Sequence, residues 1–544
     1  MYRVLVTDTL SPQGLDLLKS YSEIEVVYSP GLKPAELKEA LKEADGIVIR
    51  SGTKLTADVL DGQTRLKVIA RAGVGVDNVD LPTATRQGII VSNTPDGNTL
   101  STAEHTLAMM MAMCRNIGPA SQSMKNGQWD RKSFNGTQLA GKTIGVVGLG
   151  RIGVAVARRC RGLEMTVLGF DPFMSEERAA ENGIELYRNV DEMLTKCDFV
   201  TVHTPLTPET KNLINAARLA AMKKGVRLIN CARGGIINEE DLADAIESGH
   251  VAGAAVDVYT KEPPAADFRL SKLPQVLCTP HLAASTDEAQ EQVAVEAAEI
   301  VANFLTRNEV RSTVNMVPIS GKELEAARSY LDMAYRLGLL LAQMCKGGNI
   351  KNVQLQFKGE ANTKPIKLIT SALTSGLLTS VLGRNVSIVN AEMTAAERGI
   401  PVTTVASTEA GAFATMLSVT AETDQGTKSV AATTFGNDFL RLIRVDDYHL
   451  DAYLDGDMLL FWHKDVPGVI GAIGTAFGKQ GVNISHMAVG RGSKAPGGGA
   501  VAVLNLDNKP SDEALQEVVN HPDIIAVELV SLPEAGAPLP WLGL

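Results

Sequence analysis

Short apolar runs rich in β-branched residues alternate with helix-like stretches through the first 95 residues. Runs that are apolar at nearly every position are typical of strands buried on both faces of a parallel sheet. Between them lie helical patterns such as Pro34–Lys42, which begins with proline in the first turn. The predicted strands are Arg3–Val6, Glu25–Tyr28, Gly46–Ile49, Lys67–Ala70 and Ile89–Ser92. This pattern predicts a layered α/β unit with a doubly wound parallel sheet.

A second alternation of the same kind follows a long Ala/Met/Leu-rich helix predicted over Thr102–Cys114. Its predicted strands are Thr143–Val147, Met165–Phe170, Phe199–His203, Arg227–Asn230, Ala252–Asp257 and Val276–Thr279. A helical segment, Asp287–Leu305, comes next. We expect this helix to return the chain to the first α/β unit, because residues 1–95 do not complete that unit by themselves.

The pattern changes after Pro318. Residues 319–450 combine a predicted helix, Gly321–Met344, with β-like stretches such as Val353–Phe357, which indicates an α+β unit. Residues 455–532 show the order strand, helix, strand, strand, helix, strand, which predicts a ferredoxin-like module. The tail, 533–544, is rich in proline and glycine and is expected to be irregular. The predicted domains are 1–95 with about 287–318, 96–286, 319–450 and 455–532.

Composition narrows the class of protein. The 544 residues are 45% hydrophobic and 21% charged, with a net charge of −10, which suits a globular protein and argues against a nucleic-acid partner. No apolar run reaches the roughly 18–20 residues that span a bilayer, and the amino terminus lacks a signal-peptide pattern. We therefore expect a cytoplasmic protein. The six cysteines are scattered, without metal-ligand spacing, so no metal site is predicted.

A glycine-rich turn follows the predicted strand Thr143–Val147. Gly148, Gly150 and Gly153 allow, in turn, a tight bend, close approach of the backbone to a pyrophosphate, and close packing of helix on strand. The helix that follows presents free N–H groups and a partial positive charge to the phosphates. Asp171 ends the next strand, 21 residues after Gly150. A carboxylate there binds ribose hydroxyls and repels a 2′-phosphate, which predicts NAD as the cofactor.

Three further residues follow predicted strands of the same unit. Arg233 stands in Cys-Ala-Arg-Gly-Gly, Glu262 precedes two prolines, and His281 follows Thr-Pro. A guanidinium can bind a carboxylate bidentately, an imidazole can move a proton near neutral pH, and a carboxylate can orient that imidazole. Each residue alone could be structural, but ligands lie at the carboxyl ends of parallel strands. Together they predict His281 as the acid–base group, Glu262 as its partner and Arg233 as the substrate clamp.

The motifs GLGRIG, CARGG, DVYTKEPP and TPHLAAST, preceded by RAGVGVDNVD at Arg71–Asp80, resemble the D-isomer-specific 2-hydroxyacid dehydrogenase family. Within it the chain is most similar to the long-form D-3-phosphoglycerate dehydrogenases, and the resemblance covers essentially the whole chain. It implies that 1–95 with 287–318 is the substrate domain and that 96–286 is the NAD-binding Rossmann domain. The cofactor contacts that it implies are Val74, Gly148, Gly150, Arg151, Ile152, Gly153, Asp171, Thr204, Cys231, Ala232, Arg233, Asp257, His281, Ala283 and Ala284.

The resemblance also implies a substrate. Beside Arg233 and His281, cations at Arg50, Arg71, Arg131 and Lys132 would face a phosphate. The implied reaction is NAD-dependent oxidation of 3-phosphoglycerate to 3-phosphohydroxypyruvate, the first step of the phosphorylated route to L-serine. Two alternatives stay open: a glyoxylate or hydroxypyruvate reductase, and a non-catalytic dinucleotide-sensing corepressor.

The last module resembles the ACT domain, a small-molecule sensor that works in paired copies. The resemblance implies L-serine as an effector, held near His463, Asp465 and Asn483. A helix amino terminus at Pro467–Gly468 would suit the carboxylate of the ligand. Paired sensors imply a homo-oligomer, a dimer or a tetramer.

Overall fold

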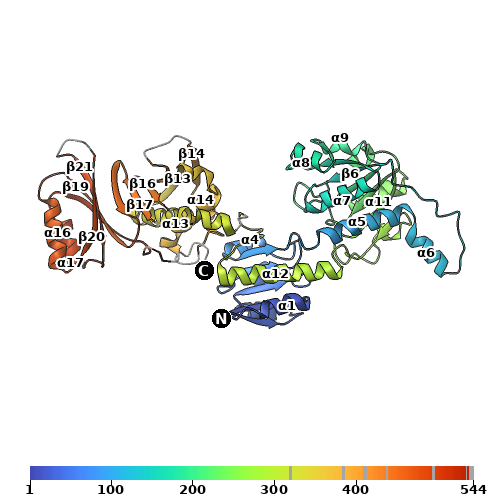
Figure 1. The fold of residues 1–544 in the computed structure, drawn as a ribbon, viewed down its shortest axis with the longest axis horizontal. Helices are drawn as coiled ribbons and strands as arrows, with labels where there is room; N and C mark the ends of the chain where they lie inside the picture. Colours follow the sequence, from blue (N-terminus) through green and yellow to red (C-terminus); the bar gives the residue numbers. More distant parts are fainter. Residues whose placement is uncertain are drawn as a thin grey trace.

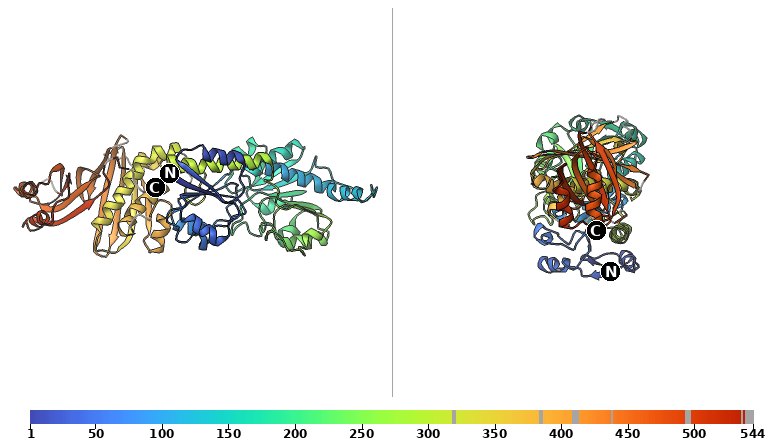
Figure 2. Two further views of the ribbon diagram at one scale, coloured as in Figure 1. Left: turned by 90° about the horizontal axis from the view of Figure 1, so that it is seen from below. Right: turned by 90° about the vertical axis from the view of Figure 1, so that its left-hand side faces the viewer.

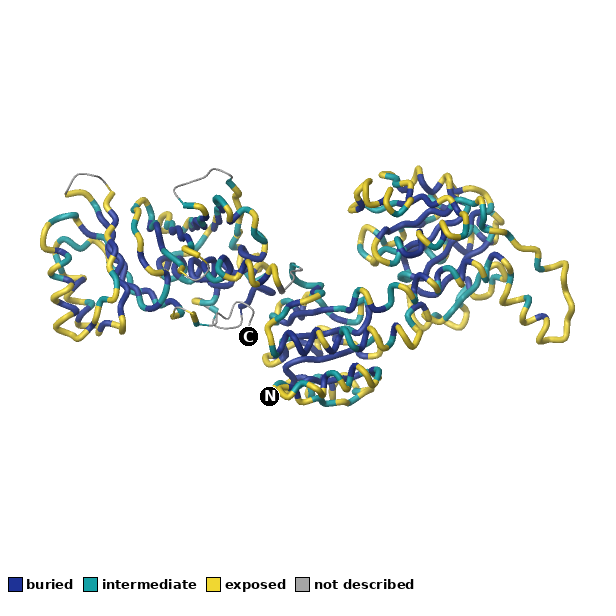
Figure 3. Tube along the Cα trace, in the orientation of Figure 1, coloured by how far each residue is buried: buried dark blue, intermediate teal, exposed yellow. Residues whose placement is uncertain are grey.

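The structure, a computed structural model, describes residues 1–317, 321–382, 386–407, 413–436, 439–492, 497–534 and 536–537. These residues form four units arranged in an elongated molecule (Figure 1). The left view of Figure 2 shows the same elongation from below, with the carboxyl-terminal unit at one end, and the right view looks along the long axis from that end. Each unit contains buried residues (Figure 3), and one hydrophobic cluster includes residues of the first, third and fourth units.

The first unit is a five-stranded sheet in the order β2-β1-β3-β4-β5, and all of its pairings are parallel. Its strands are β1 Tyr2–Val6, β2 Ile24–Tyr28, β3 Gly46–Ile49, β4 Val68–Arg71 and β5 Ile90–Asn93. Its short helices are α1 Pro12–Lys19, α2 Pro34–Leu41, α3 Ala57–Leu60 and α4 Leu81–Arg86. The long helix α12, Asp287–Arg307, returns to this unit, where Ala294, Ala297 and Val301 join its core.

The second unit is a seven-stranded parallel sheet in the order β12-β11-β10-β9-β6-β7-β8. Its strands are β6 Thr143–Val147, β7 Thr166–Phe170, β8 Glu185–Tyr187, β9 Phe199–Val202, β10 Val226–Asn230, β11 Val251–Val256 and β12 Val276–Cys278. Its helices are α5 Thr99–Cys114, α6 Ile117–Lys125, α7 Arg151–Gly162, α8 Glu176–Glu181, α9 Val190–Leu194, α10 Ala216–Ala221 and α11 Glu239–Glu247, with a 3₁₀ turn at Leu270–Lys272. The carboxyl ends of all its strands meet at one edge, where the predicted catalytic segments lie.

The third unit is a six-stranded sheet in the order β14-β13-β15-β16-β17-β18. Only β13 and β14 are parallel in it. Its strands are β13 Ile350–Gly359, β14 Val402–Ser407, β15 Thr415–Thr423, β16 Gly426–Phe435, β17 Phe439–Val445 and β18 Tyr448–Tyr453. Its helices are α13 Gly321–Met344, α14 Ile366–Leu382 and α15 Ala391–Glu397, with a 3₁₀ turn at Glu360–Thr363.

The fourth unit has the predicted βαββαβ order and an antiparallel sheet arranged β20-β21-β19-β22. Its strands are β19 Asp457–Lys464, β20 Ile484–Arg491, β21 Gly499–Leu506 and β22 Ile524–Ser531, and its helices are α16 Val469–Lys479 and α17 Asp512–Val519. Arg336 of α13 joins this unit to the third one, because its guanidinium donates to the carbonyls of Leu454 and Pro533. The predicted fold class, two parallel α/β layers followed by an α+β unit and a ferredoxin-like module, is confirmed. The boundaries between the domains stay a prediction.

The structure also bears on two expectations drawn from composition. In the part of the chain that the structure describes, no helix is both long and apolar enough to cross a membrane. All six cysteines are free, and five of them are buried.

Candidate active site

The glycine-rich turn joins β6 to α7 and is packed tightly. Gly148 has a φ of 93°, and a Cβ there would lie 2.6 Å from the carbonyl oxygen of His203. A Cβ on Gly153 would lie 1.9 Å from the carbonyl oxygen of Gly148. A Cβ on Gly150 would instead meet open space. The turn therefore needs glycine at 148 and 153 for its shape, and Gly150 leaves the amino end of α7 open to a ligand.

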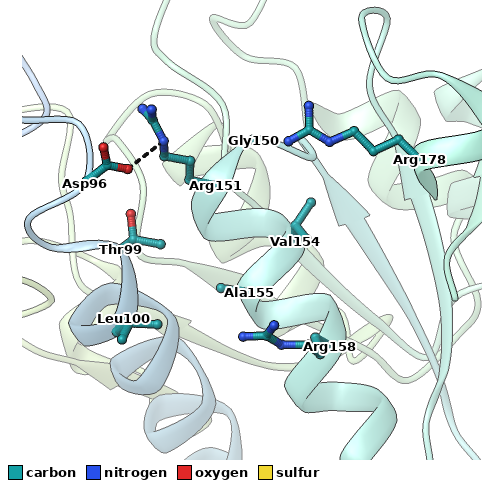
Figure 4. A pocket seen from close by; sticks show the side chains of 9 residues that line it. All are labelled: Asp96, Thr99, Leu100, Gly150, Arg151, Val154, Ala155, Arg158 and Arg178. Carbon is teal, nitrogen blue, oxygen red and sulfur yellow. Dashed lines mark ion pairs between the residues drawn. The ribbon is translucent and has the colours of Figure 1, made fainter. Parts of the chain in front are cut away.

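A pocket of about 280 Å³ opens beside this turn (Figure 4). Three arginines, Arg151, Arg158 and Arg178, are among the residues that line it, and Figure 4 shows the guanidinium of Arg178 pointing toward Gly150. Arg151 pairs with Asp96, with 2.7 Å between Nε and Oδ1. The basic lining and the free amino end of α7 suit the phosphates of a dinucleotide.

Polar atoms beside the turn fit the same ligand. Asp171 follows β7, and its carboxylate accepts hydrogen bonds from the backbone N–H groups of Leu149 and Phe173. These bonds hold Asp171 against the turn. After β9, Nδ1 of His203 and Oγ1 of Thr204 are buried and have no hydrogen-bond partner among the described residues. Burial lowers the pKa of His203 to about 4, so this ring is neutral and can take part in hydrogen bonds without carrying charge.

His281 and Glu262, the residues predicted as the acid–base group and its partner, are in contact. Nδ1 of His281, after β12, lies 2.8 Å from Oε2 of Glu262, after β11, and the other carboxylate oxygen of Glu262 accepts from the backbone N–H of Tyr259. Both side chains are partly exposed. Because Nδ1 faces Glu262, the other ring nitrogen is left to face a substrate. The backbone of His281 lies in the left-handed region, with a φ of 54°, which only neighbouring contacts can maintain.

Arg233 and Arg71 meet at the boundary between the first and second units. Nε of Arg233, after β10, donates to Asp77 over 3.0 Å, and the two residues lie 156 positions apart. Two glycines of the Arg71–Asp80 segment leave room for the guanidiniums: a Cβ on Gly73 would lie 1.6 Å from Arg71, and one on Gly75 would lie 1.8 Å from Arg233. The sequence pattern of this motif did not predict that its glycines make room for the guanidiniums or that Asp77 pairs with Arg233.

The environment of Arg71 favours an anion. Burial, together with the nearby positive charges of Arg233 and Arg50, lowers the pKa of Arg71 to about 10, although Asp77 and Asp8 oppose the shift. Its Nε is buried, and no described residue accepts from it. A cluster of like charges with an unsatisfied donor is stabilised when a negatively charged ligand binds.

The structure does not bring every predicted residue to this place. Arg131 and Lys132 are exposed in the segment that follows α6, which projects from the second unit (Figures 1 and 3). Of the other predicted cofactor residues, Val74 accepts a hydrogen bond from Asn93 through its carbonyl. Cys231 is buried, and burial raises the pKa of its thiol to about 12, so it stays protonated.

The predicted sensor residues are partly paired within the fourth unit. Asp465 pairs with Arg491 at 3.0 Å, and the side chain of Asn483 donates to Asp507 over 2.6 Å. His463 is 2% exposed, and its Nδ1 lies 2.7 Å from the carbonyl oxygen of Lys464, whereas its buried Nε2 has no hydrogen-bond partner among the described residues. Gly468 caps α16 with a φ of 100°, and a Cβ on Gly471 or Gly474 would meet no heavy atom within 4 Å. This face of α16 therefore has no neighbour among the described residues.

Comparison with known proteins gives three family matches along the chain. Residues 107–283 match the NAD-binding domain of the D-isomer specific 2-hydroxyacid dehydrogenases. Residues 326–446 match the D-3-phosphoglycerate dehydrogenase intervening domain, and residues 458–523 match the ACT domain.

Relatives that match nearly the whole chain are D-3-phosphoglycerate dehydrogenases. The chain is 42% identical over 533 residues to the D-3-phosphoglycerate dehydrogenase of Bacillus subtilis, covering 98% of this chain and 100% of that one. It is 41% identical over 530 residues to the enzyme of the same name from Archaeoglobus fulgidus, covering 97% and 100%. Among solved structures, a glyoxylate reductase from Paecilomyes thermophila superposes with a TM-score of 0.54 at 26% identity, covering 57% of this chain and 98% of that one. The TT0316 protein from Thermus thermophilus gives 0.53 at 36% identity, covering 57% and 99%.

Proposed function

Because this chain belongs to the D-3-phosphoglycerate dehydrogenases, a branch of the D-isomer-specific 2-hydroxyacid dehydrogenases, we propose how its residues carry out that reaction. The enzyme is an NAD-dependent dehydrogenase that oxidises the CH–OH group of 3-phosphoglycerate to the ketone of 3-phosphohydroxypyruvate. This is the step that commits 3-phosphoglycerate to the phosphorylated route to L-serine. The full-length relatives do not favour the alternative of a glyoxylate or hydroxypyruvate reductase.

NAD is held at the carboxyl edge of the second unit. The backbone of Gly150 and Arg151 would bind the pyrophosphate, Asp171 would bind the adenosine ribose, and the segments at Cys231–Arg233 and Asp257 would hold the nicotinamide. When bound, NAD accepts the hydride from C2 of the substrate. The open space at Gly150 and the unsatisfied atoms of His203 and Thr204 support this assignment.

His281 is the acid–base group. As the hydride leaves C2, the ring nitrogen that faces away from Glu262 takes the hydroxyl proton, and the C–O single bond becomes a carbonyl. Glu262 orients the ring and stabilises the imidazolium that forms. The distance of 2.8 Å between the imidazole and the carboxylate supports this division of roles.

Arg233 and Arg71 bind the two anionic ends of the substrate, with Arg50 adding to the field. The observation that carries the proposal is the clustering of these guanidiniums at the boundary of the first two units, where Arg233 follows β10 at the same sheet edge that carries His281 after β12. A doubly anionic 2-hydroxyacid satisfies such a cluster better than a small, singly charged one.

The test is NADH formation, followed at 340 nm, when purified protein is mixed with NAD and D-3-phosphoglycerate. We expect turnover with NAD and much weaker turnover with NADP, because Asp171 repels a 2′-phosphate. Lack of turnover with D-3-phosphoglycerate would overturn the assignment. Serine added to the same assay tests the effector separately, since unchanged rates would remove only that part of the proposal.

The quaternary structure and the effector are also part of the proposal. The projecting segment around α6 exposes Ile117, Met124 and Trp129, and Trp129 is 78% exposed, which supports a homo-oligomer in which this segment is covered by a second copy. Such a contact would carry Arg131 and Lys132 toward the substrate phosphate of the partner. L-serine would bind between paired fourth units, near the amino end of α16. Free cysteines support a cytoplasmic location, where thiols stay reduced.

A further inference from the structure

His105 lies beside the machinery described above, yet no role has been assigned to it. It stands on α5, and its Nε2 is 3.3 Å from Oδ1 of Asp257 and 3.4 Å from Oγ1 of Thr279. The ring is mostly buried, with 20% of the side chain exposed, whereas the Asp257 side chain is 0% exposed. His105 is therefore packed against a buried carboxylate at the end of β11.

Asp257 organises the loop that carries His281. Its backbone carbonyl accepts from the N–H of His281 over 2.9 Å. Its carboxylate accepts from the next two backbone N–H groups, of Leu282 over 2.8 Å and of Ala283 over 3.0 Å. Three successive N–H groups thus point at one residue. This arrangement maintains the left-handed backbone of His281 and aims its ring at Glu262.

The carboxylate must be charged for this arrangement to hold, and burial opposes its charge. Burial alone would raise the pKa of Asp257, but hydrogen bonds from His105, Thr279 and Leu282, with the charge of His105, hold it below the ordinary value. A buried carboxylate that loses a donor either takes up a proton or moves toward water. Either change would weaken its hold on the backbone of residues 282 and 283.

We propose that His105 is a positioning residue: Nε2–H of His105 donates to the buried carboxylate of Asp257, which fixes the loop that aims His281. It does not touch the substrate and acts only through Asp257. The inference rests on the proposed acid–base role of His281. Its effect falls on the geometry of proton transfer, so kcat responds more than the KM for D-3-phosphoglycerate.

Two variants distinguish the effect of the hydrogen-bond donor of His105 from the effect of its ring volume. His105→Phe keeps a planar ring of similar size without a donor, and His105→Gln keeps an N–H donor near the position of Nε2. Because small misplacements of a reacting group cost up to about a hundredfold in rate, we expect His105→Phe to lower kcat by about tenfold to a hundredfold. The KM for D-3-phosphoglycerate should change less than about threefold, and His105→Gln should recover most of kcat.

A second donor to the same carboxylate oxygen gives a further test if His105→Phe folds poorly. Oγ1 of Thr279 donates to Oδ1 of Asp257 over 2.6 Å, so Thr279→Val should lower kcat in the same way, and Thr279→Ser should restore it. NADH binding, followed by fluorescence, and the midpoint of thermal unfolding show whether each variant is folded.

Three results would overturn the proposal. These are wild-type kcat in His105→Phe, equal losses in His105→Phe and His105→Gln, or a loss confined to KM. The wild-type enzyme and His281→Ala are assayed alongside. If wild type turns over D-3-phosphoglycerate and His281→Ala does not, a normal His105→Phe removes this inference and leaves the proposed function intact.

Discussion

The amino ends of α7 and α16 look alike in sequence, since each follows a strand and a glycine, but the structure surrounds them differently. At α7 the turn is closed by contacts that only glycine allows, at Gly148 and Gly153. Buried polar atoms of His203 and Thr204, which lie against Gly148, lack hydrogen-bond partners among the described residues. At α16 the helix face at Gly471 and Gly474 is open.

The polar groups near α16 are partly paired within the fourth unit. Asp465 pairs with Arg491 and Asn483 donates to Asp507, whereas Nε2 of the buried His463 has no hydrogen-bond partner among the described residues. The turn before α7 is shaped by contacts within one chain, and the face of α16 at Gly471 and Gly474 has no neighbour in the described part of the chain. A helix amino terminus by itself does not distinguish these surroundings; the packing around its glycines does.

The largest expected effect is on kcat, when the proposed acid–base group in the second unit is removed. His281→Ala should lower kcat by about 10²–10⁴-fold, because the group that takes the hydroxyl proton is removed. NADH binding, measured by fluorescence, should survive. Glu262→Gln should lower kcat less, since the imidazole remains. A His281→Ala enzyme that keeps most of its rate would show that another group moves the proton.

Equivalent glycine-to-alanine changes should have opposite effects at the two helices. In Gly153→Ala the new methyl group meets the carbonyl of Gly148, so we expect at least tenfold weaker NADH binding and a loss of about 1–3 kcal/mol in stability. In Gly471→Ala the methyl group meets nothing within 4 Å, so helix propensity should stabilise α16 by up to about 1 kcal/mol. Thermal unfolding and NADH titration of both variants measure the contrast. Equal losses in the two would mean that the open face of α16 is packed in solution.

The sensor residues should affect regulation without affecting basal turnover. Asp465→Asn removes a charge next to Arg491, and we expect at least about a tenfold rise in the serine concentration that gives half-inhibition. Asp523→Asn, which alters a different ion pair of the same unit, with Lys464, is the matched control and should respond as wild type does. Identical serine curves for all three proteins would place the effector elsewhere.

The smallest effect concerns pH. Burial and the neighbouring charge of Asp96 raise the pKa of Glu296, on α12, to about 7. Between pH 4.5 and 7 the unfolded chain has lost this proton and the folded chain keeps it, so stability falls as the pH rises through this range. Glu296→Gln removes that loss and should stabilise the protein by on the order of 1 kcal/mol at pH 8, after solvent screening, and hardly at all at pH 4.5. Thermal unfolding at the two pH values measures this difference, and a gain of equal size at both would contradict it.

Much of the fold could be predicted because strands buried in a parallel sheet are continuous apolar runs in the sequence. β3 and β6 begin and end where the apolar runs Gly46–Ile49 and Thr143–Val147 do. The carboxyl ends of such strands share one edge, so Arg233, Glu262 and His281 could be placed near one another from their positions after strands alone.

The remaining features depend on contacts that no local pattern encodes. Arg233 meets Asp77 across 156 residues, and His105 meets Asp257 from a helix whose sequence looks like ordinary core. Arg131 and Lys132 were expected to face the substrate phosphate, yet they are exposed in the segment after α6, which projects from the second unit (Figure 1).

The most direct test of the account compares kcat/KM for D-3-phosphoglycerate with kcat/KM for D-glycerate, which lacks the phosphate, in wild type and in Arg71→Met. Methionine fills much of the space of the partly buried arginine without its charge. We predict that wild type prefers the phosphorylated acid by at least about 10³-fold, and that Arg71→Met loses at least about 2 kcal/mol of that preference. A wild-type ratio near one, or a ratio that Arg71→Met leaves unchanged, would contradict the claim that this guanidinium cluster selects the substrate.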